Sequence, residues 1–588
     1  MGPLTVLASK EEVLKVSDEI VWSVIRQCQL TNKTFEDPDF PASNRSIGIV
    51  HKKINGEEIG DLPDEIVWLR PKDILTLGRL DSQMNWETWR DPWHFHVKQG
   101  AMGDCWLISA LKTMPRRKAL LEQILPKRAY SLEYGIFQIR LCVDKEWRVL
   151  ILDDFFPCEY QRFELYAYST QKQLFVSIIE KAFAKLKGTY GQIHGGDQGY
   201  AFELLTGAFC EKHTVSETCD QDALWKMLCH AQSSGFLMGA GTPSLEDATQ
   251  IRAVGLSPNH AYAVMGISVQ HGHRLIQIGN PNSNIGWKGK WSKWPSWSEA
   301  LTDTLKRLEL WDYGLFWMEL DDFCQWFTDI IVCHYREGWN EVRIKQVVDK
   351  SDKENTIIRL LIDKPCQVSV EVSPKLGKYT SNFINIHRST SDNRIGECVQ
   401  SSFYIGNHLT TDSFNLEPGT YFVVFSSFYY KEPTDLIWVI RSDMPISYDT
   451  LQMQTDYETI MHESLQQMVL KYGRIEENKE ETIVFRTWFK EDATILMAEN
   501  HKKWNYLMVK CDSSESKNVN CWGAINGEYW QVPPMSRRIL VCIKKDKKAV
   551  GKPDVNIKLE YRLQWYYLPL ELEKNDGLNH PNLPITPA

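Results

Sequence analysis

Cys105 stands where a glycine-containing turn meets an apolar run. The stretch QGAMGDCWLISAL, residues 99–111, continues after the cysteine with hydrophobic residues that predict a buried helix, and Gly103-Asp104 predicts the turn and cap that start it. In a first helical turn, unpaired N–H groups and the positive end of the helix dipole favour an anion, so the Cys105 thiol is expected to ionise more readily than a free thiol. A thiolate is a nucleophile. Simple packing of a buried cysteine explains the local stretch equally well.

Attack on a carbonyl also needs a base, a group that orients the base, and donors for the oxyanion. His260 opens one predicted strand and Asn280 ends the next. Two antiparallel strands can place these side chains next to each other, with the amide oxygen accepting from one imidazole nitrogen while the other faces the sulfur. Gln99 carries an amide that can donate to the oxyanion together with the backbone N–H of Cys105. The sequence order Gln, Cys, His, Asn is typical of papain-like thiol proteases.

Hydrophobic periodicity indicates which elements would hold these residues. Helical patterns dominate from about residue 100 to 187, and an apolar stripe over 174–186 predicts a helix that ends at Gly188. After about residue 210 the runs become shorter, and HAYAVMGISV and HRLIQIGNP predict two strands joined by a turn at Gly272. A helical half that carries the cysteine would therefore face a sheet that carries the histidine.

Beyond about residue 335 the patterning is rich in strands. CQVSVEV alternates valines on one face, and GTYFVVFSSFYY predicts another strand, a pattern typical of a β-sandwich. One helical stripe, from Met461 to Tyr472, interrupts the strands before RRILVCI and VNIKLEYRLQW resume them. Two β-rich modules are expected, at about 336–450 and 475–575.

These patterns predict an α+β multidomain protein, in which a two-lobed core that resembles papain-like cysteine proteases is followed by two β-rich sandwich-like modules. The core would have a helical lobe and a β-sheet lobe. The expected divisions are residues 1–195 for the N-terminal segment and helical lobe with Cys105, 196–335 for the sheet lobe with His260 and Asn280, 336–450 for the first sandwich-like module, and 451–588 for the helix and second module.

Composition excludes several classes of protein. The 588 residues exceed what one hydrophobic core needs, and 43% hydrophobic with 24% charged residues is typical of globular chains. A formal net charge of -9 without a lysine or arginine block offers no basic surface to nucleic acid. The sequence shows neither a secretion signal nor an uncharged apolar run long enough to span a membrane. We expect an intracellular, cytoplasmic protein.

The spacing of the cysteines and histidines in the sequence predicts no metal site. The 14 cysteines are scattered singly without a Cys-x-x-Cys pair, which argues against a zinc ribbon and against a disulfide scaffold. His94-x-His96 and His271-x-His273 have the spacing of metal pairs, but each lacks a partner motif. No metal ligand is predicted.

Several stretches in succession resemble the calpain family of cysteine proteases. The core signatures are QGAMGDCW, NHAYAVMGI, IGNPNSNIGWKGKW and YGLFWMELDDF, and the likeness spans roughly residues 20–335. Four further stretches resemble the small-optic-lobes (SOL) subfamily, in which a characteristic C-terminal region replaces the calcium-binding EF-hand domain. They are YGIFQIRLCVDKEWRVLILDDFFPC, FNLEPGTYFVVFSSF, VKCDSSESKNVNCWGA and VPPMSRRILVCIK. The zinc fingers that precede the core in longer relatives have no counterpart here.

This resemblance implies a role for each candidate residue. Cys105 would be the nucleophile, His260 the general base and then acid, and Asn280 the orienting amide. Gln99 would be the oxyanion donor. Gly195-Gly196 resembles the glycine pair whose backbone binds an extended substrate strand, although a plain turn explains Gly195 and Gly196 equally well.

Two departures from the family pattern lie next to these residues. The family usually has Gly before the catalytic His and Trp after Asn-Pro, where this sequence has Asn259 and Asn282. The tryptophan is thought to shield the His–Asn hydrogen bond from water, so its replacement bears on efficiency more than on mechanism. Trp287 or Trp291 would be the substitutes for that shield.

The resemblance also raises calcium as a cofactor, because conventional calpains use acidic side chains in two core sites to bring the lobes together. Ca²⁺ needs several oxygen ligands, preferably carboxylates. Where those acids are expected, the sequence has His96, Gly286, Lys293, Tyr313 and Leu315. Asp303 and Asp312 are neighbouring acids, and a calcium site would need them to replace the missing carboxylate ligands. No cofactor is certain, and weak or absent calcium dependence of the core is expected.

The leading interpretation is a calpain-type endopeptidase that makes limited cuts in protein substrates through a Cys-His-Asn acyl-enzyme. The alternative is a catalytically silent calpain-fold adaptor whose C-terminal modules bind a protein or membrane-surface partner. The intact catalytic set argues against that alternative. A transglutaminase-like acyl transferase ranks last, because that class usually has Asp where Asn280 stands.

Overall fold

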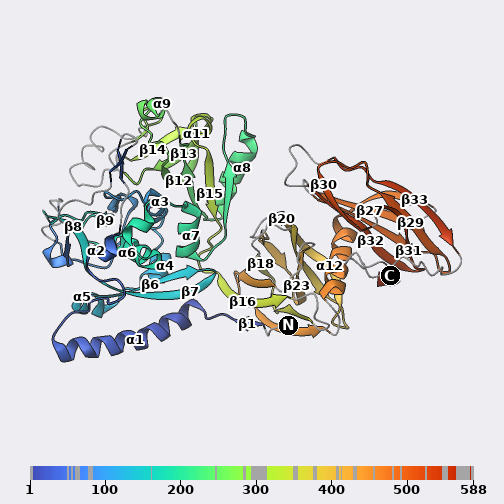
Figure 1. The fold of residues 1–588 in the computed structure, drawn as a ribbon, viewed down its shortest axis with the longest axis horizontal. Coiled ribbons are helices and arrows are strands. Elements are labelled where there is room, and N and C mark those ends of the chain that lie inside the picture. Colours follow the sequence, from blue (N-terminus) through green and yellow to red (C-terminus); the bar gives the residue numbers. More distant parts are fainter. Residues whose placement is uncertain are drawn as a thin grey trace. The chain divides into compact units, whose positions relative to one another are not determined.

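The computed structural model of the chain divides into two compact units, Ala8–Gly338 and Trp339–Ala588 together with Met1–Leu7 (Figure 1). Among the residues whose structure is described, no helix is long and apolar enough to cross a membrane. The structure describes residues 4–48, 52–54, 57–59, 66–76, 84–160, 162–244, 248–282, 286–292, 314–348, 355–374, 381–405, 409–411, 413–427, 434–453, 457–479, 482–490, 493–523, 526–545, 554–564 and 583–584.

The helical lobe of the first unit is built around α3, Cys105–Lys112, and α6, Phe175–Lys187. Their apolar residues share one core with the antiparallel hairpin of β6, Ile136–Val143, and β7, Glu146–Asp153. The predicted helix over 174–186 is confirmed, with Gly188 as its C-cap. The hairpin departs from the helical pattern expected over 100–187. The other elements of this lobe are α1 (Lys10–Thr31), α2 (Asn44–Ile47), β2 (Lys52–Ile54), β3 (Glu57–Ile59), β4 (Ile66–Leu69), β5 (Val97–Lys98), α4 (Lys118–Ile124), α5 (Ala129–Tyr134), β8 (Phe156–Glu159), β9 (Tyr168–Ser169) and α7 (Gln198–Thr206).

The sheet lobe holds a six-stranded sheet in the order β10-β15-β11-β12-β13-β14, antiparallel throughout. β12, Ala261–Gln270, and β13, His273–Gly279, form the predicted hairpin around Gly272. Helices α8, Gln221–Ser233, and α11, Leu320–Trp326, contribute to the core of this lobe. Its remaining elements are β10 (Cys210–Thr214), β11 (Leu237–Gly241), α9 (Thr249–Ala253), β14 (Leu315–Glu319) and β15 (Asp329–Cys333).

The second unit begins with two sheets that share one core, as the alternating valines predicted. One sheet has the order β1-β16-β24-β18-β21, with β22 also paired to β18, and the other has the order β20-β19-β23-β17-β25. The strands are β1 (Thr5–Val6), β16 (Asn340–Val348), β17 (Asn355–Ile362), β18 (Cys366–Pro374), β19 (Ser381–Ser389), β20 (Ile395–Ile405), β21 (Leu409–Thr410), β22 (Phe414–Leu416), β23 (Gly419–Ser427), β24 (Thr434–Ser442) and β25 (Ser447–Met453).

Helix α12, Tyr457–Tyr472, lies between this sandwich and the next pair of sheets. Its apolar stripe shares a core with Phe383 of the first pair and Trp488 of the second. The second pair has the orders β26-β27-β28-β32-β30, with β34 on β32, and β31-β29-β33. These strands are β26 (Arg474–Lys479), β27 (Ile483–Lys490), β28 (Ala493–Asn500), β29 (Tyr506–Asp512), β30 (Val519–Gly523), β31 (Asn526–Val532), β32 (Ser536–Lys545), β33 (Lys558–Gln564) and β34 (Leu583–Pro584).

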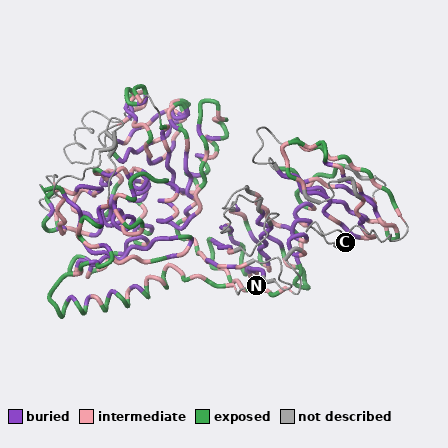
Figure 2. The backbone as a smooth tube through the Cα atoms, in the orientation of Figure 1, coloured by how far each residue is buried: buried purple, intermediate pink, exposed green. Residues whose placement is uncertain are grey.

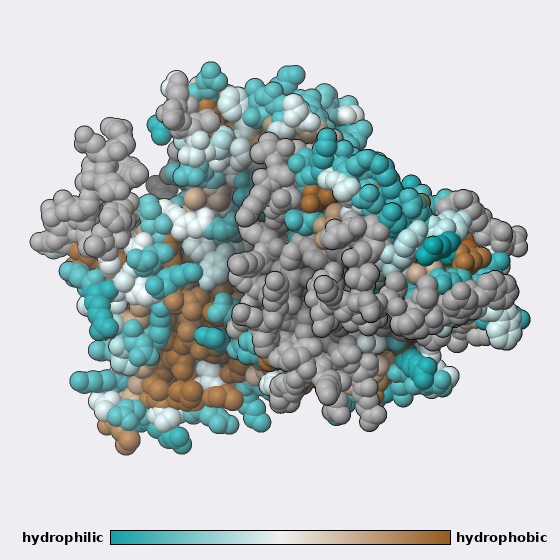
Figure 3. Space-filling model, turned by 45° about the vertical axis from the view of Figure 1, so that its right-hand side comes forward, coloured by the Kyte–Doolittle hydropathy of each residue, from teal (hydrophilic) through white to brown (hydrophobic). Residues whose placement is uncertain are grey.

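Helix α1 differs in burial from the helices of the cores. A capping box between Ser9 and Glu12 fixes its start. In Figure 2 its tube is mostly green and pink, and Trp22 and Leu30 are among its exposed apolar residues. Figure 3 shows a face on which most described residues are hydrophilic or neutral, while hydrophobic residues gather low on the left. Burial is therefore concentrated in the two lobes and in the sandwiches.

Candidate active site

Cys105 is the first residue of α3, as predicted. Asp104 holds the N-cap position, and its backbone carbonyl accepts from the N–H groups of Leu107 (2.8 Å) and Ile108 (3.1 Å). Its side chain makes no capping bond, which differs from the cap expected at Gly103-Asp104, because the carboxyl is fully buried instead. The helix start therefore positions the sulfur while the acid beside it points into the protein.

His260 and Asn280 are joined by a hydrogen bond of 2.8 Å between imidazole Nε2 and amide Oδ1. Asn280 is fully buried, and its Oδ1 also accepts from the backbone N–H of Asn282 at 3.0 Å. An oxygen that accepts from Nε2–H fixes that tautomer of the neutral ring, so Nδ1 is left as the basic nitrogen. This geometry is the one that an orienting role of Asn280 requires.

Three neighbours hold His260 at the start of β12. The Thr242 hydroxyl accepts from the His260 backbone N–H at 3.1 Å and donates to the Ser257 carbonyl at 2.7 Å. Tyr262 meets the imidazole edge-on, with ring centroids 4.8 Å apart. Asn259, which replaces the usual glycine, has φ of 47°, a left-handed conformation that Asn tolerates better than most residues. Sequence spacing gave no signal for Thr242 or Tyr262.

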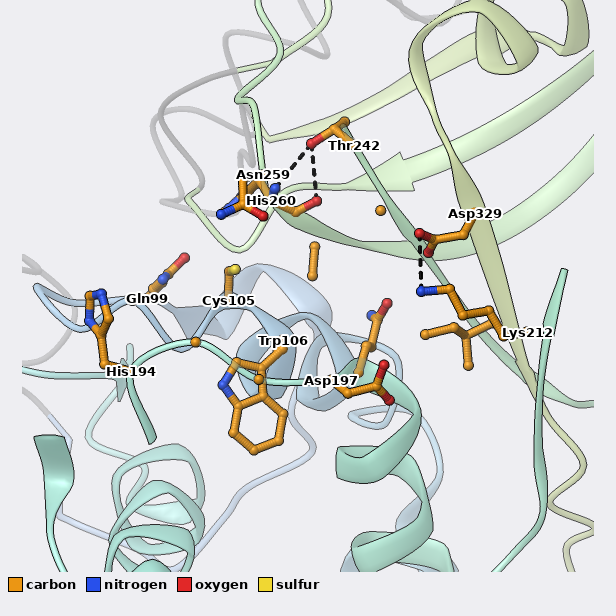
Figure 4. A pocket seen from close by; sticks show the side chains of 17 residues that line it. Gln99, Cys105, Trp106, His194, Asp197, Lys212, Thr242, Asn259, His260 and Asp329 are labelled. Carbon is orange, nitrogen blue, oxygen red and sulfur yellow. Dashed lines mark hydrogen bonds and ion pairs between the residues drawn. The ribbon is translucent and has the colours of Figure 1, made fainter. Parts of the chain in front are cut away.

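One cavity of about 490 Å³ gathers these groups between the two lobes of the first unit. Figure 4 shows Cys105 on the helix below and His260 above it, with Gln99 to one side. The sulfur accepts from the backbone N–H of Ala261, the residue after the histidine. The structure thus brings Cys105, His260 and Gln99 to one cavity with Asn280 behind the imidazole. Its lining residues are Gln99, Gly103, Cys105, Trp106, His194, Gly195, Gly196, Asp197, Gln198, Lys212, Gly241, Thr242, Asn259, His260, Ala261, Asp329 and Ile331.

Burial governs the charges of the reacting groups. Burial, with the neighbouring Asp104 as a smaller cause, raises the pKa of Cys105 to about 11. Burial also lowers the pKa of His260, against the opposing effect of its bond to Asn280. The expected easily ionised thiol is therefore wrong for this arrangement, because loss of solvent outweighs the helix end.

The Gln99 amide lies on the side of the cavity opposite Asp329 in Figure 4. Its Nε2 donates to the Met102 carbonyl at 2.8 Å, and the amide also faces the Asp104 carboxyl, so the role of Gln99 as oxyanion donor stays a prediction. The backbone N–H of Gln99 donates across the lobes to the Pro281 carbonyl at 3.3 Å, beside Asn280. This hydrogen bond fixes the position of Gln99 relative to the sheet lobe.

Both candidate glycines line the cavity. A Cβ on Gly196 would lie 2.3 Å from the Trp106 ring, so this position has no room for a side chain. Gly195 has φ of 73° and donates its N–H to the Gly103 carbonyl at 2.8 Å. The absence of side chains leaves backbone exposed along the cavity wall next to Cys105.

Neither tryptophan considered as a substitute shield covers the His–Asn bond. Trp287 packs into the core of the sheet lobe and donates to the Lys290 carbonyl at 2.8 Å. Trp291 contacts His273, with ring centroids 5.4 Å apart and the rings tilted by 56°, at the opposite end of β13 from Asn280. The bond nevertheless involves a fully buried amide, so it is shielded without them.

Of the positions where the resemblance predicts calcium ligands, His96, Gly286 and Leu315 are described, and none of them offers that ion a side-chain oxygen. His96 is buried, and its Nδ1 faces the Gln173 amide nitrogen at 3.1 Å and the Trp93 N–H at 3.0 Å. Burial lowers the pKa of His96 to about 4, so the position offers a neutral imidazole engaged with donors, where Ca²⁺ requires oxygens. Gly286 and Leu315 offer only backbone oxygen. Lys293, Asp303, Asp312 and Tyr313 lie outside the described residues, within which no group of three or more His, Cys, Asp or Glu is arranged to hold a metal.

The chain is similar to proteases over its first unit. Residues 35–334, just over half of the chain, match the calpain family of cysteine proteases, and residues 468–566 match the Calpain-D-like C-terminal domain. Calpain-type cysteine protease ADL1 of Oryza sativa subsp. japonica is 34% identical over 318 residues, which cover 51% of this chain and 14% of that protein. Calpain-9 of Rattus norvegicus is 30% identical over 321 residues, which cover 53% of this chain and 44% of that protein.

These alignments leave much of each relative unmatched, so the chain spans about a seventh of the plant protein and under half of calpain-9. A solved structure of the cysteine protease and lectin-like domains of Cwp84 from Clostridium difficile covers 75% of this chain at 10% identity, with a TM-score of 0.17 that carries no conclusion. The family match, in contrast, contains the nucleophile candidate, the His–Asn pair and the cavity that joins them. The chain belongs to the calpain family of cysteine proteases.

Proposed function

We propose that this protein is a cysteine endopeptidase that makes limited cuts in protein substrates. The observation that carries the proposal is the 2.8 Å bond from His260 to Asn280 at a cavity that also holds Cys105 and Gln99. This set supplies a nucleophile, a base with a fixed tautomer and an oxyanion donor. A protein that acts only as an adaptor needs none of these three groups.

In the proposed reaction, the Cys105 proton passes to His260 Nδ1 as the sulfur attacks the scissile carbonyl. The developing oxyanion is stabilised by the Gln99 amide and the backbone N–H of Cys105. The imidazolium returns the proton to the leaving amine, the C–N bond breaks, and a thioester remains on the sulfur. Water then attacks the thioester with His260 as base, and this step releases the acid and restores the thiol.

The binding of substrate, the subfamily and the roles of the domains are proposed from the site and from the family matches. The open backbone of Gly195 and Gly196 supports binding of an extended peptide along the cavity wall. The match to a Calpain-D-like C-terminal domain supports assignment to calpains of the small-optic-lobes type, and we propose a cytoplasmic location for the protein. We also propose the divisions at residues 335 and 450, while the first division follows α7, which lies beyond residue 195 but packs in the core of the helical lobe. The C-terminal modules are proposed to recruit a protein or membrane-surface partner.

The test is to incubate the wild-type chain and Cys105→Ala with an active-site-directed epoxide and with a denatured protein. Labelling of Cys105 and cleavage by the wild type alone support the endopeptidase. A folded wild-type protein that is neither labelled nor active would favour the adaptor. Incorporation of an amine without cleavage would favour an acyl transferase.

A further inference from the structure

The wall that the sheet lobe contributes to the cavity has few side chains. β11 carries Gly239 and Gly241 on one face of the sheet. Because side chains alternate along a strand, Met238 and Ala240 point to the other face, where they are part of the core of the sheet lobe. Gln198 of α7 covers Gly239, since a Cβ there would lie 2.1 Å from the Gln198 amide oxygen. Gly241 lines the cavity, so a hollow remains on the sheet over this glycine.

Two charged residues of neighbouring strands border the hollow over Gly241. Asp329 of β15 is paired directly with Gly241, so its side chain lies on the same face of the sheet. Ile331, two residues further on, shares that face, and Lys212 of β10 is paired with Ile331. Lys212 Nζ lies 3.3 Å from Asp329 Oδ2. A Cβ on Gly241 would lie 2.9 Å from Asp329 Oδ1, so the glycine leaves this carboxylate open to the hollow.

A second carboxylate reaches the hollow from the helical lobe. Asp197 lines the same cavity and is the N-cap of α7, where its side chain accepts from the Tyr200 N–H at 2.9 Å. This capping bond fixes the position of the carboxylate. Figure 4 shows Asp197 on the same side of Cys105 as Lys212 and Asp329. Acids from both lobes therefore face one end of the cavity.

The charges at this end of the cavity do not balance. Apart from histidines, the ionisable acids and bases among the described lining residues with an ordinary charge are Asp197, Lys212 and Asp329. The Lys212 side chain is 59% exposed, and its 3.3 Å separation from Asp329 is longer than the about 2.7–2.9 Å of a strong charged hydrogen bond. Such an exposed pair is weak. The Asp329 side chain is only 20% exposed, so the excess negative charge lies where a cation would be attracted.

We propose that this end of the cavity binds a basic side chain, lysine or arginine, of an extended peptide substrate, with Asp329 and Asp197 as the specificity-determining residues. The inference deepens the proposed function and rests on it, because the peptide backbone would lie along Gly195 and Gly196. Successive side chains of an extended peptide point in opposite directions, so every second one can enter the hollow. The cationic group would contact the two carboxylates while its methylene groups pack on Ile331.

The test measures binding without cleavage. The full-length Cys105→Ala chain is titrated into fluorescein-labelled peptides of otherwise identical, uncharged sequence, in which one residue is Arg, its uncharged isostere citrulline, or Glu. Fluorescence anisotropy then gives the Kd of each peptide. At low salt the Arg peptide should bind about tenfold more tightly than the citrulline peptide, and the Glu peptide should bind most weakly. High salt should reduce the advantage of Arg.

Two further substitutions in the Cys105→Ala chain should act in opposite directions. Asp329→Asn removes a carboxylate, so the advantage of Arg over citrulline should fall to roughly threefold or less. Lys212→Gln removes the competing ammonium group, so the advantage should increase. Asp222→Asn is the matched control, because it breaks the 2.7 Å ion pair with Arg274 in the same lobe without touching the cavity, and it should keep the ratio of the parent chain.

Three outcomes would overturn the inference: equal affinity for the Arg and citrulline peptides, a full Arg advantage in Asp329→Asn, or no binding of any peptide. Because no bond is cut, the measurement stands even if the epoxide and cleavage tests defeat the proposed function. Should Asp329→Asn fail to fold, the Cys105→Ala chain decides alone. An Arg advantage that declines as salt rises supports the site, and one that does not respond to salt refutes it.

Discussion

His260 and Asn280 lie at the same end of neighbouring strands, and imidazole Nε2 donates to amide Oδ1 at 2.8 Å. The amide is fully buried, so the bond is made in a setting with little competition from water. Because the ring is fixed through Nε2, Nδ1 is the nitrogen that can take a proton from sulfur. The arrangement makes the Asn280 side chain an orienting group and not a proton carrier.

Asn280→Ala should therefore slow turnover by roughly 10²-fold while leaving measurable activity, since a positioned base contributes about 10²–10⁴-fold. Steady-state kinetics with a fluorogenic peptide would measure the effect in kcat. Asn282→Ala is the matched control, because it keeps the backbone N–H that reaches Asn280 Oδ1. A loss as complete as that of Cys105→Ala would mean that Asn280 does more than orient.

Periodicity predicted the elements with one buried face. The apolar stripe over 174–186 and the paired runs around Gly272 became α6 and the β12–β13 hairpin. The β6–β7 hairpin was missed although β6 alternates the apolar residues Phe137, Ile139 and Leu141 with the polar residues Gln138 and Arg140, which the fold also buries. Its turn, Asp144-Lys145, has φ of 52° and 65° and was a second local signal of a hairpin.

Spacing identified the reacting residues because chemistry restricts their types. Cys105, His260, Asn280 and Gln99 all reach one site, although their roles remain predictions. The supporting residues were not predictable, since Thr242 and Tyr262 are of common types and only the tertiary fold shows that they contact His260. The ionisation of Cys105 was misjudged because burial depends on the opposite lobe, which the local sequence does not contain.

Calcium removal should not change the activity of the core. His96 is a neutral imidazole held by the amide nitrogen of Gln173, so this position gives no carboxylate to Ca²⁺. Peptide cleavage by the purified chain should be equal in millimolar EDTA and in millimolar Ca²⁺. Activity that disappears with EDTA and returns with Ca²⁺, but not with Mg²⁺, would contradict this inference.

The buried ion pair of Lys181 and Asp153 should be essential to the helical lobe. Lys181 is 0% exposed, and besides Asp153 it donates to the Phe155 carbonyl at 2.7 Å. Lys181→Met would leave a buried carboxylate without its cation and should lower the free energy of unfolding by about 3–5 kcal/mol. Denaturant unfolding of the first unit would measure it. Lys118→Met, which breaks the exposed pair with Asp91, should leave the midpoint unchanged.

A buried histidine should make the second unit sensitive to acid. His387 of β19 is fully buried, its Nε2 is 2.8 Å from the Ser464 hydroxyl of α12, and its Nδ1 is 3.3 Å from the Gly396 carbonyl. Burial lowers the pKa of His387 to about 3, below the value of about 6.5 for an unfolded histidine. Its stabilising contribution is thus complete above about pH 6.5 and is lost as the pH falls toward about 3.

Lowering the pH from about 7.5 to about 5 should reduce the free energy of unfolding of the second unit by about 2 kcal/mol through His387 alone. His387→Gln cannot take up the proton, so the fall in its unfolding free energy over that interval should be smaller by the same amount, whatever its stability at neutral pH. Denaturant titrations at both pH values would measure the difference. His271→Asn, on the exposed turn of the β12–β13 hairpin, serves as the substitution control and should keep the wild-type fall. An equal fall in His387→Gln and the wild type would show that acid acts on the unit through other groups.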